Sequence, residues 1–317
     1  MGSQPIATPQ ASTKTERYRD RERALWDHYG LSPTERFIEL AAPRIRLRIV
    51  EVGSGEPILF VPGTAGVGPS WGALLAELTG YRAILLDRPG WGLSDPIDYS
   101  KHEYKRVAVD VLRGVLDSLG IERVPVVGAS VGGNWALRFA EAEPARVSRV
   151  VMLGAGPLSD ELEPPGFFKL LVTPIGAIIV RLPSNPKQIR SILGGLGHGP
   201  SLADGRIPDV YIDWRVGFDR LTSSMRNERR MVQSMVAGGR FRPGITCSAD
   251  GLARSETPTM MVYGTADAPG TVDAWRRFTD RLPHGELLVL DDAGHLPWLD
   301  DPKKVASAIR RFLGAAA

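Results

Sequence analysis

A serine lies at the centre of a run of small residues, Gly128-Ala-Ser-Val-Gly132. The β-branched run 124–127 before it predicts a buried strand, and the segment 131–142 after it predicts a helix. Strand, tight turn and helix around Gly-x-Ser-x-Gly form the setting in which a serine hydroxyl is exposed as a nucleophile. The two glycines allow the sharp turn because they lack a Cβ atom. We therefore expect Ser130 to attack a carbonyl carbon, with the adjacent helix N-terminus favouring the negative charge that develops.

The same pattern occurs a second time, at Gly68-Pro-Ser-Trp-Gly72. Ser70 follows a loop rich in glycine and proline instead of a strand, and it precedes a predicted helix over 71–79. This context predicts an N-cap serine and no nucleophile.

Strand and helix patterns alternate on both sides of Ser130. The alternation predicts a mostly parallel sheet with helices on both faces, with ligands at the carboxyl ends of its strands. Arg44 to Val52 alternates arginine with apolar residues, which predicts a half-exposed antiparallel strand. Further strands are expected at 57–61, 83–86, 147–153, 258–263 and 286–290, and further helices at 102–119, 271–282 and 302–313.

The alternation stops between residues 156 and 245, where we predict a helical cap inserted between the core segments 31–155 and 246–317. Helices are expected within it at 167–182, 186–195 and 212–236. Its large apolar residues are expected to pack the cap helices on one another; a second interpretation makes part of them the roof of an apolar pocket. They comprise the run 167–180 and Trp214, Phe218, Met225, Met231 and Met235.

Residues 1–30 are expected to form an N-terminal extension. Its first 14 residues are polar and predict disorder, and they do not resemble a secretory signal. Residues 15–30 predict an exposed helix ending at Gly30, or an arm that packs on a neighbouring molecule. The sequence leaves open whether the protein forms a homo-oligomer.

Overall composition is that of an ordinary globular protein, with 43% hydrophobic and 24% charged residues. A net charge of +3, without a block of lysine or arginine, does not indicate nucleic-acid binding. Cys247 is the only cysteine, which excludes an intrachain disulfide and fits a cytoplasmic location. The longest apolar run, 170–180, contains Pro174 and Gly176 and is too short to span a bilayer.

Four segments together resemble the α/β-hydrolase fold superfamily, over about residues 44–155 and 256–315. They are Asp87-Arg-Pro-Gly-Trp-Gly-Leu-Ser94, Gly128–Gly132, Tyr263-Gly-Thr-Ala-Asp267 and Ala293-Gly-His-Leu-Pro-Trp-Leu-Asp-Asp-Pro302. The resemblance implies an α/β-hydrolase core and a serine hydrolase with a Ser-Asp-His triad. We expect the Asp87 loop to be structural, with its carboxylate capping backbone amides.

In this superfamily the triad follows the chain order serine, acid, histidine. His295 follows the last predicted strand, on the active edge of the sheet, and is the expected base. His284 precedes that strand, and His198 lies in a glycine-rich cap segment where a surface loop is expected.

The expected acid is Asp267, directly after its strand; its alternative role is to cap the helix 271–282. Asp160 and Glu161 are alternative acids, because they follow the strand 147–153. We expect the backbone N–H groups of Thr64 and Val131 to form the oxyanion hole. Family members commonly carry His-Gly where this chain has Pro62-Gly63. The Thr64 hydroxyl is either a further donor or that of a simple turn residue.

These residues predict hydrolysis of a carboxylic ester or lactone of a small, largely apolar molecule through an acyl-enzyme, with neither cofactor nor metal. Dehalogenases and epoxide hydrolases of the superfamily use an aspartate where this chain has Ser130. Two alternatives stay open. One is a carbon–carbon bond hydrolase of ring-cleavage products, because the loop Gly66-Val-Gly-Pro-Ser70 of this chain resembles a loop of those enzymes. The other is a non-catalytic ligand receptor.

Overall fold

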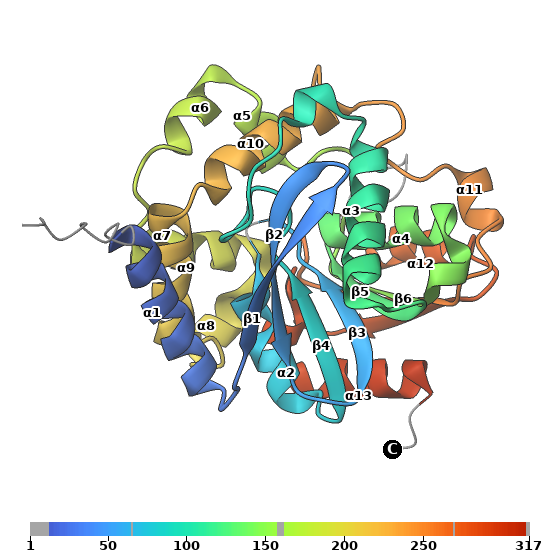
Figure 1. The fold of residues 1–317 in the computed structure, drawn as a ribbon, viewed down its shortest axis with the longest axis horizontal. Coiled ribbons are helices and arrows are strands. Elements are labelled where there is room, and N and C mark those ends of the chain that lie inside the picture. Colours follow the sequence, from blue (N-terminus) through green and yellow to red (C-terminus); the bar gives the residue numbers. More distant parts are fainter. Residues whose placement is uncertain (1–12, 65, 157–161, 269, 315–317) are drawn as a thin grey trace, which may run out of the picture.

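The computed structural model describes residues 13–64, 66–156, 162–268 and 270–314. Within them, one sheet has the strand order β1-β2-β4-β3-β5-β6-β9-β10 (Figure 1). β1 and β4 both pair antiparallel with β2, and the remaining pairs are parallel, which confirms the mostly parallel sheet. The strands are β1 (Thr34–Ala41), β2 (Arg44–Val52), β3 (Glu56–Val61), β4 (Tyr81–Leu86), β5 (Val124–Ala129), β6 (Val147–Leu153), β9 (Thr259–Gly264) and β10 (Gly285–Leu290).

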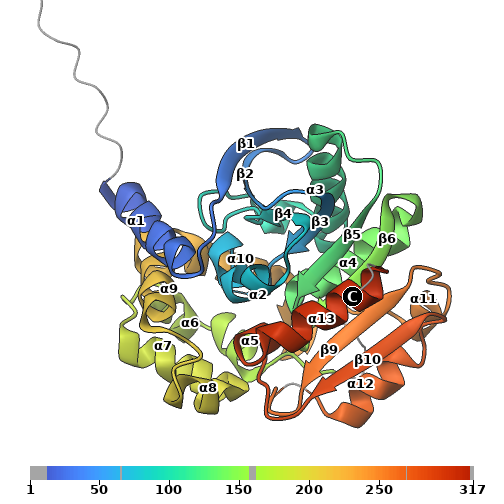
Figure 2. The same cartoon turned by 90° about the horizontal axis from the view of Figure 1, so that it is seen from below.

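Helices cover both faces of this sheet, as expected. On one face α2 (Gly72–Glu77) packs against α13 (Pro302–Leu313), and on the other α3 (Tyr104–Leu119) packs against α4 (Val131–Ala142) (Figure 2). α12 (Val272–Thr279) packs on β9 and β10. The apolar stripe of α3 is buried, which explains why a helix rather than a strand forms there.

Two expectations at the start of the core are wrong. Ser70 does not cap α2: it lies in a 3-10 turn, Gly68–Trp71, and its hydroxyl donates to the Val67 carbonyl. Only the first part of β2 is half-exposed, because Arg48 and the residues after it are buried between β1 and β4. β1 itself was not expected from the sequence.

Helix α1 (Thr13–His28) is not the exposed arm that its charged composition predicts. Tyr18, Leu25 and Trp26 are buried, and the helix packs on α9 (Asp209–Leu221) of the same chain. The three side chains lie at positions that share one helix face, and the many charges between them hide this stripe in the sequence. Gly30, with φ +65°, follows the end of the helix as expected.

The segment between β6 and β9 is mostly helical (Figure 1). Pro174, which begins a new helix capped by Thr173, divides the helix expected over 167–182, and a break at Thr222 divides the one expected over 212–236. One strand pair, β7 (Val236–Ala237) with β8 (Arg240–Phe241), was not expected. The helices are α5 (Gly166–Leu171), α6 (Pro174–Ile179), α7 (Pro186–Leu193), α8 (Gly199–Ala203), α9 and α10 (Ser224–Met235), with α11 (Ala249–Ala253) after them.

Large apolar side chains fill the interior of this helical segment. Trp214, Phe218, Met231 and Met235 are buried and Met225 is half-buried, which supports packing of the helices on one another. For the run 167–180 this expectation is largely wrong, because Ile175 and Ile178 are each 61% exposed. Cys247 is buried. Among the described helices, none is both long and apolar enough to cross a bilayer.

Candidate active site

Ser130 lies in a tight turn between β5 and α4, with φ +49° and ψ −116°. A positive φ is uncommon for a residue with a side chain, and such strained positions cluster at functional sites. The turn is crowded: a Cβ on Gly128 would lie 2.3 Å from the Gly132 carbonyl oxygen, and one on Gly132 would lie 2.0 Å from that of Val61. Only glycine fits at either position, which is the reason for the spacing seen in the sequence.

Asp267 and His295 form a close pair at the ends of β9 and β10. Asp267 Oδ1 lies 2.9 Å from His295 Nδ1, and Oδ2 accepts the Ala155 N–H at 2.8 Å. The Asp267 side chain is fully buried, whereas that of His295 is 14% exposed. The carboxylate is therefore held by both oxygens, and it orients the imidazole with Nε2 left for another partner. Thr271, not Asp267, caps α12.

One short segment at the end of β6, residues 153–156, contacts Ser130, Asp267 and His295. The Leu153 carbonyl accepts the Ser130 N–H at 3.1 Å, and the Ala155 N–H binds Asp267. Two glycines in the segment make the closest approaches. A Cβ on Gly154 would lie 2.0 Å from the His295 carbonyl oxygen, and one on Gly156 would lie 2.4 Å from that of Ser130.

The other candidate acids and bases lie elsewhere. His284 is exposed beside Glu256, at the start of β10. Asp160 and Glu161 lie outside the described residues.

The loop after β3 packs against the Ser130 turn. A Cβ on Gly63 would lie 3.0 Å from Ser130 Cβ and 2.8 Å from the Ala129 carbonyl oxygen. Thr64 follows in this loop, and its hydroxyl oxygen is buried without a hydrogen-bond partner among the described residues. Val131 is the first residue of α4. The candidate oxyanion donors thus come from the two segments that flank Ser130.

A buried arginine that the sequence analysis did not single out holds this loop. Arg88 Nη2 donates to the Gly63 carbonyl at 2.8 Å, and Nη1 lies 3.1 Å from Met231 Sδ. The guanidinium carbon lies 4.2 Å from the centre of the Trp91 ring, a cation–π contact. The only signal in the sequence was the position of Arg88, directly after Asp87 in a loop that follows a strand.

His198 is completely buried, so the surface position expected for it is wrong. Its Nδ1 lies 2.8 Å from Asp300 Oδ2, and its Nε2 accepts the Leu296 N–H at 3.1 Å. Because Nε2 accepts, the ring proton lies on Nδ1 and is donated to Asp300. The π-helical turn Gly194–His198 buries this ring, an environment that a glycine-rich sequence does not reveal.

Three successive backbone N–H groups around His295 are held from this side. Asp300 Oδ2 accepts that of Gly294 at 2.8 Å, the Leu196 carbonyl accepts that of His295 at 2.9 Å, and His198 accepts that of Leu296. Two of the three acceptors belong to the helical segment between β6 and β9. This segment therefore fixes the loop that carries His295.

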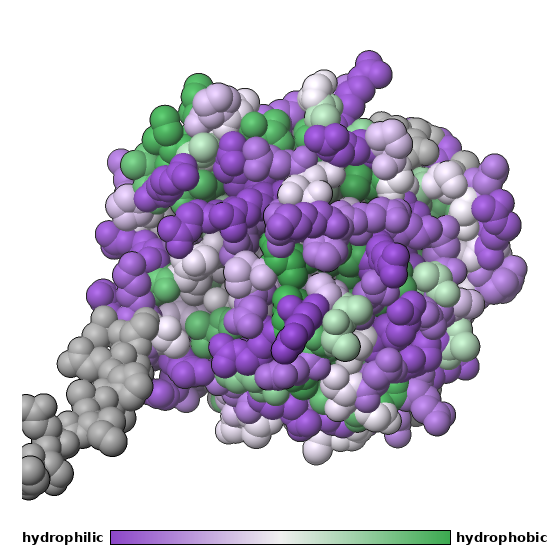
Figure 3. Space-filling view, turned by 45° about the horizontal axis from the view of Figure 1, so that its top comes forward, coloured by the Kyte–Doolittle hydropathy of each residue, from purple (hydrophilic) through white to green (hydrophobic). Residues whose placement is uncertain are grey.

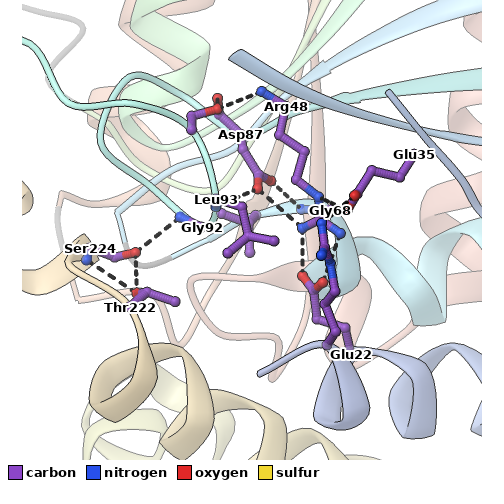
Figure 4. A network of polar contacts seen from close by, with 12 residues as sticks. Glu22, Glu35, Arg48, Gly68, Asp87, Gly92, Leu93, Thr222 and Ser224 are labelled. Carbon is purple, nitrogen blue, oxygen red and sulfur yellow. Dashed lines mark hydrogen bonds and ion pairs between the residues drawn. The ribbon is translucent and has the colours of Figure 1, made fainter. Parts of the chain in front are cut away.

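A buried charge network supports the loop after β4, which carries Asp87 and Arg88 (Figure 4). Arg48 donates to both oxygens of Glu22 at 2.8 and 2.7 Å, to Glu35 at 2.6 Å and to Asp87 at 3.3 Å. Asp87 also accepts the N–H groups of Gly68 and Leu93, which confirms that it caps backbone amides. The network joins α1, β1 and β2 to the loop that carries Arg88.

Burial and the neighbouring carboxylate set the protonation of this network. Burial raises the pKa of Asp87 to about 6, against the lowering effect of Arg48 and with a further rise from Glu22. Burial alone would lower the pKa of Arg48, but the charges of Glu22 and Asp87 raise it above its ordinary value. Among the described residues, no cluster of three histidine, cysteine or acidic side chains could hold a metal ion.

Curated relatives align with most of the chain. The 2-hydroxy-6-oxononadienedioate/2-hydroxy-6-oxononatrienedioate hydrolase 2 of Pseudomonas putida is 27% identical over 267 residues, which cover 79% of this chain and 85% of the relative. The corresponding hydrolase of Cupriavidus pinatubonensis is 25% identical over 299 residues, covering 89% and 96%.

Solved structures share the fold. The 2-hydroxy-6-oxo-6-phenylhexa-2,4-dienoate hydrolase of a Rhodococcus species superposes with a TM-score of 0.71 at 20% identity, covering 90% of this chain and all of that one (100%). A naproxen esterase from Bacillus subtilis superposes with a TM-score of 0.71 at 18% identity, covering 96% and 100%. The family model described as "Alpha/beta hydrolase family" matches residues 58–308. The chain belongs to the alpha/beta hydrolase family.

Proposed function

We propose that Ser130, His295 and Asp267 form the catalytic triad of a hydrolase that cleaves a small-molecule carboxylic ester or lactone. The observation that supports this most is the convergence of all three residues on the segment 153–156, with Asp267 held by both oxygens. His295 takes the Ser130 proton as the hydroxyl oxygen attacks the carbonyl carbon, and then protonates the leaving alcohol. It next activates a water molecule, which releases the acid and restores Ser130.

The negative charge of the tetrahedral intermediate needs donors beside Ser130. We assign this role to the backbone N–H groups of Thr64 and Val131, because their segments flank the serine on its two sides. Arg88 supports the first of them by holding the preceding carbonyl, that of Gly63. Asp267 keeps His295 in one tautomer and stabilises its positive form.

The relatives favour a second candidate reaction. Their names describe hydrolysis of 2-hydroxy-6-oxo dienedioates, and they align with 79% and 89% of this chain. Cleavage of a carbon–carbon bond next to a carbonyl would use the same serine, histidine and oxyanion donors. The two candidates therefore differ in substrate and share the site.

The first experiment is labelling of the folded protein with a fluorophosphonate, followed by intact-mass measurement and peptide mapping. Ser130→Ala is the test variant. Ser70→Ala is the matched control, because Ser70 lies in the second Gly-x-Ser-x-Gly pattern. We expect one label per molecule, at Ser130, lost in S130A and retained in S70A. No labelling of the folded wild-type protein would overturn the proposal and favour a ligand receptor.

Turnover then separates the two reactions. The wild-type protein and S130A are given p-nitrophenyl esters and lactones of increasing acyl length and, separately, a 2-hydroxy-6-oxo dienedioate. Hydrolysis of an ester or lactone by the wild-type protein but not by S130A supports the first candidate. A kcat/KM for the dienedioate at least a hundredfold above that for any ester would replace it with the second.

A further inference from the structure

The exposed large apolar side chains of the described residues all lie between Phe167 and Ile192. Figure 3 shows hydrophobic surface gathered at the upper left, where Figure 1 places α5 and α6. Ile175 and Ile178 are each 61% exposed, and Leu182 is 62% exposed. We name this region the apolar cap surface; it consists of Phe167, Leu170, Ile175, Ile178, Ile179 and Leu182.

These side chains stand on a well-packed pair of short helices. A Cβ on Gly176 would lie 2.5 Å from the Leu170 carbonyl oxygen, so α6 approaches α5 as closely as a glycine allows. Thr173 caps α6 by accepting the Gly176 N–H, and Arg229 of α10 donates to the Thr173 carbonyl at 3.4 Å. The two helices are therefore held by these contacts on their inner side, and the exposed apolar side chains lie on their outer side.

The segment that carries the apolar cap surface has an excess of positive charge. Residues 164–203 include two lysines and two arginines and neither aspartate nor glutamate. Glu163 pairs with Lys169, and Asp209 pairs with Arg190. Arg181 and Lys187 pair with no carboxylate in the described part of the chain. Among the described residues, Arg181 and Lys187 therefore add positive charge that no ion pair neutralises to a segment whose exposed side chains are largely apolar.

We propose that the apolar cap surface docks on an anionic lipid surface. Apolar side chains flanked by lysine and arginine are typical of segments that lie in the membrane interface, where the side chains enter the boundary between headgroups and acyl chains. The cations would neutralise lipid phosphates. A second copy of the chain fits less well, because a two-fold interface brings each patch against itself and would place the same cations opposite one another.

The test is co-sedimentation of the full-length protein with vesicles of phosphatidylcholine alone and of phosphatidylcholine mixed with phosphatidylglycerol. One variant, I175S/I178S/L182S, removes exposed apolar side chains, and a second, R181Q/K187Q, removes the two cations. The matched charge control is K303Q/K304Q on α13, an exposed pair at the opposite end of the molecule from α6 (Figure 1). Thermal unfolding checks that each variant is folded.

We expect binding to the anionic vesicles that weakens as salt is added. The apolar variant should bind at least tenfold less and R181Q/K187Q several-fold less, while K303Q/K304Q should match the wild type. Absence of binding at low salt, or equal binding to neutral vesicles, would overturn the proposal. So would a concentration-dependent dimer that the apolar variant abolishes, because the surface would then be an interface between copies. Binding is measured without turnover, so the result does not depend on the proposed reaction.

Discussion

His198 holds the peptide that follows the candidate base: its Nε2 accepts the N–H of Leu296 at 3.1 Å. A side chain from the segment between β6 and β9 thereby positions His295, without contact to the reacting atoms. The same ring donates through Nδ1 to Asp300, whose carboxylate accepts the N–H of Gly294. The two residues that flank His295 are thus held through one imidazole.

Two substitutions at position 198 separate these contacts. In His198→Gln the amide oxygen can take the place of Nε2 and accept the Leu296 N–H. In His198→Asn the amide N–H₂ can take the place of Nδ1 and reach Asp300 only. We expect kcat to fall by about 10- to 100-fold in the asparagine variant and by much less in the glutamine variant, with little change in KM, because misplacing a catalytic group slows the chemical step. Equal losses in both variants would contradict a role exerted through Leu296.

Arg88 should matter through the Gly63 carbonyl. Arg88→Lys shortens the side chain and removes the fork that reaches both Gly63 and Met231, so we expect kcat to fall by roughly tenfold or more with a smaller change in KM. Met231→Leu is the matched control. It removes the sulfur contact at nearly constant volume, and kcat should stay within about twofold of the wild type. A loss in M231L as large as that in R88K would place the effect in the packing of α10 and not in the loop of Gly63.

Glu22 should contribute much more to stability than its position in a charged helix predicts. It binds Arg48 through both oxygens, and both side chains are buried. Glu22→Ala leaves the buried arginine without the partner that it binds through two hydrogen bonds, and we expect the free energy of unfolding to fall by about 3 kcal/mol. Glu16→Ala, at an exposed position of the same helix, should change it by less than about 0.5 kcal/mol. Urea unfolding compares the two; similar values would mean that the network does not hold α1.

The Asp87 carboxyl should make the protein less stable as the pH rises. Its pKa is raised from an ordinary 3.8 to about 6, so the folded protein keeps this proton at pH values where the unfolded chain has released it. Raising the pH from about 4 to about 6 therefore removes stability, on the order of 3 kcal/mol from this group. Other carboxyl groups change the stability in the opposite direction as the pH rises. The effect of Asp87 is therefore measured as a difference between the wild type and a variant.

Asp87→Asn removes this titration and isolates its effect. The free energy of unfolding of the wild type minus that of the variant should decrease between about pH 4 and pH 6 and change little above. A difference that stays constant, or that increases with pH, would show that Arg48 keeps Asp87 ionised throughout.

The residues nearest the proposed chemistry could be predicted from the sequence, because the position of each depends on a local pattern. Ser130 follows a buried strand and lies between two glycines that only a tight turn explains. Asp267 lies three residues after the end of β9, and His295 lies five residues after the end of β10. Parallel strands end at the same edge of a sheet, so residues after different strands meet although they are far apart in the chain.

The contacts around this site were decided only by the tertiary structure. His198 and Asp300 are 102 residues apart, and the imidazole is buried because a glycine-rich turn packs on the loop of His295. The charged composition of residues 15–30 predicts that Glu22 is exposed to solvent. In the structure it is buried, because β2 places Arg48 beside it. A side chain's burial and partners depend on which distant segments reach it, and no local pattern of apolar residues or glycines carries that information.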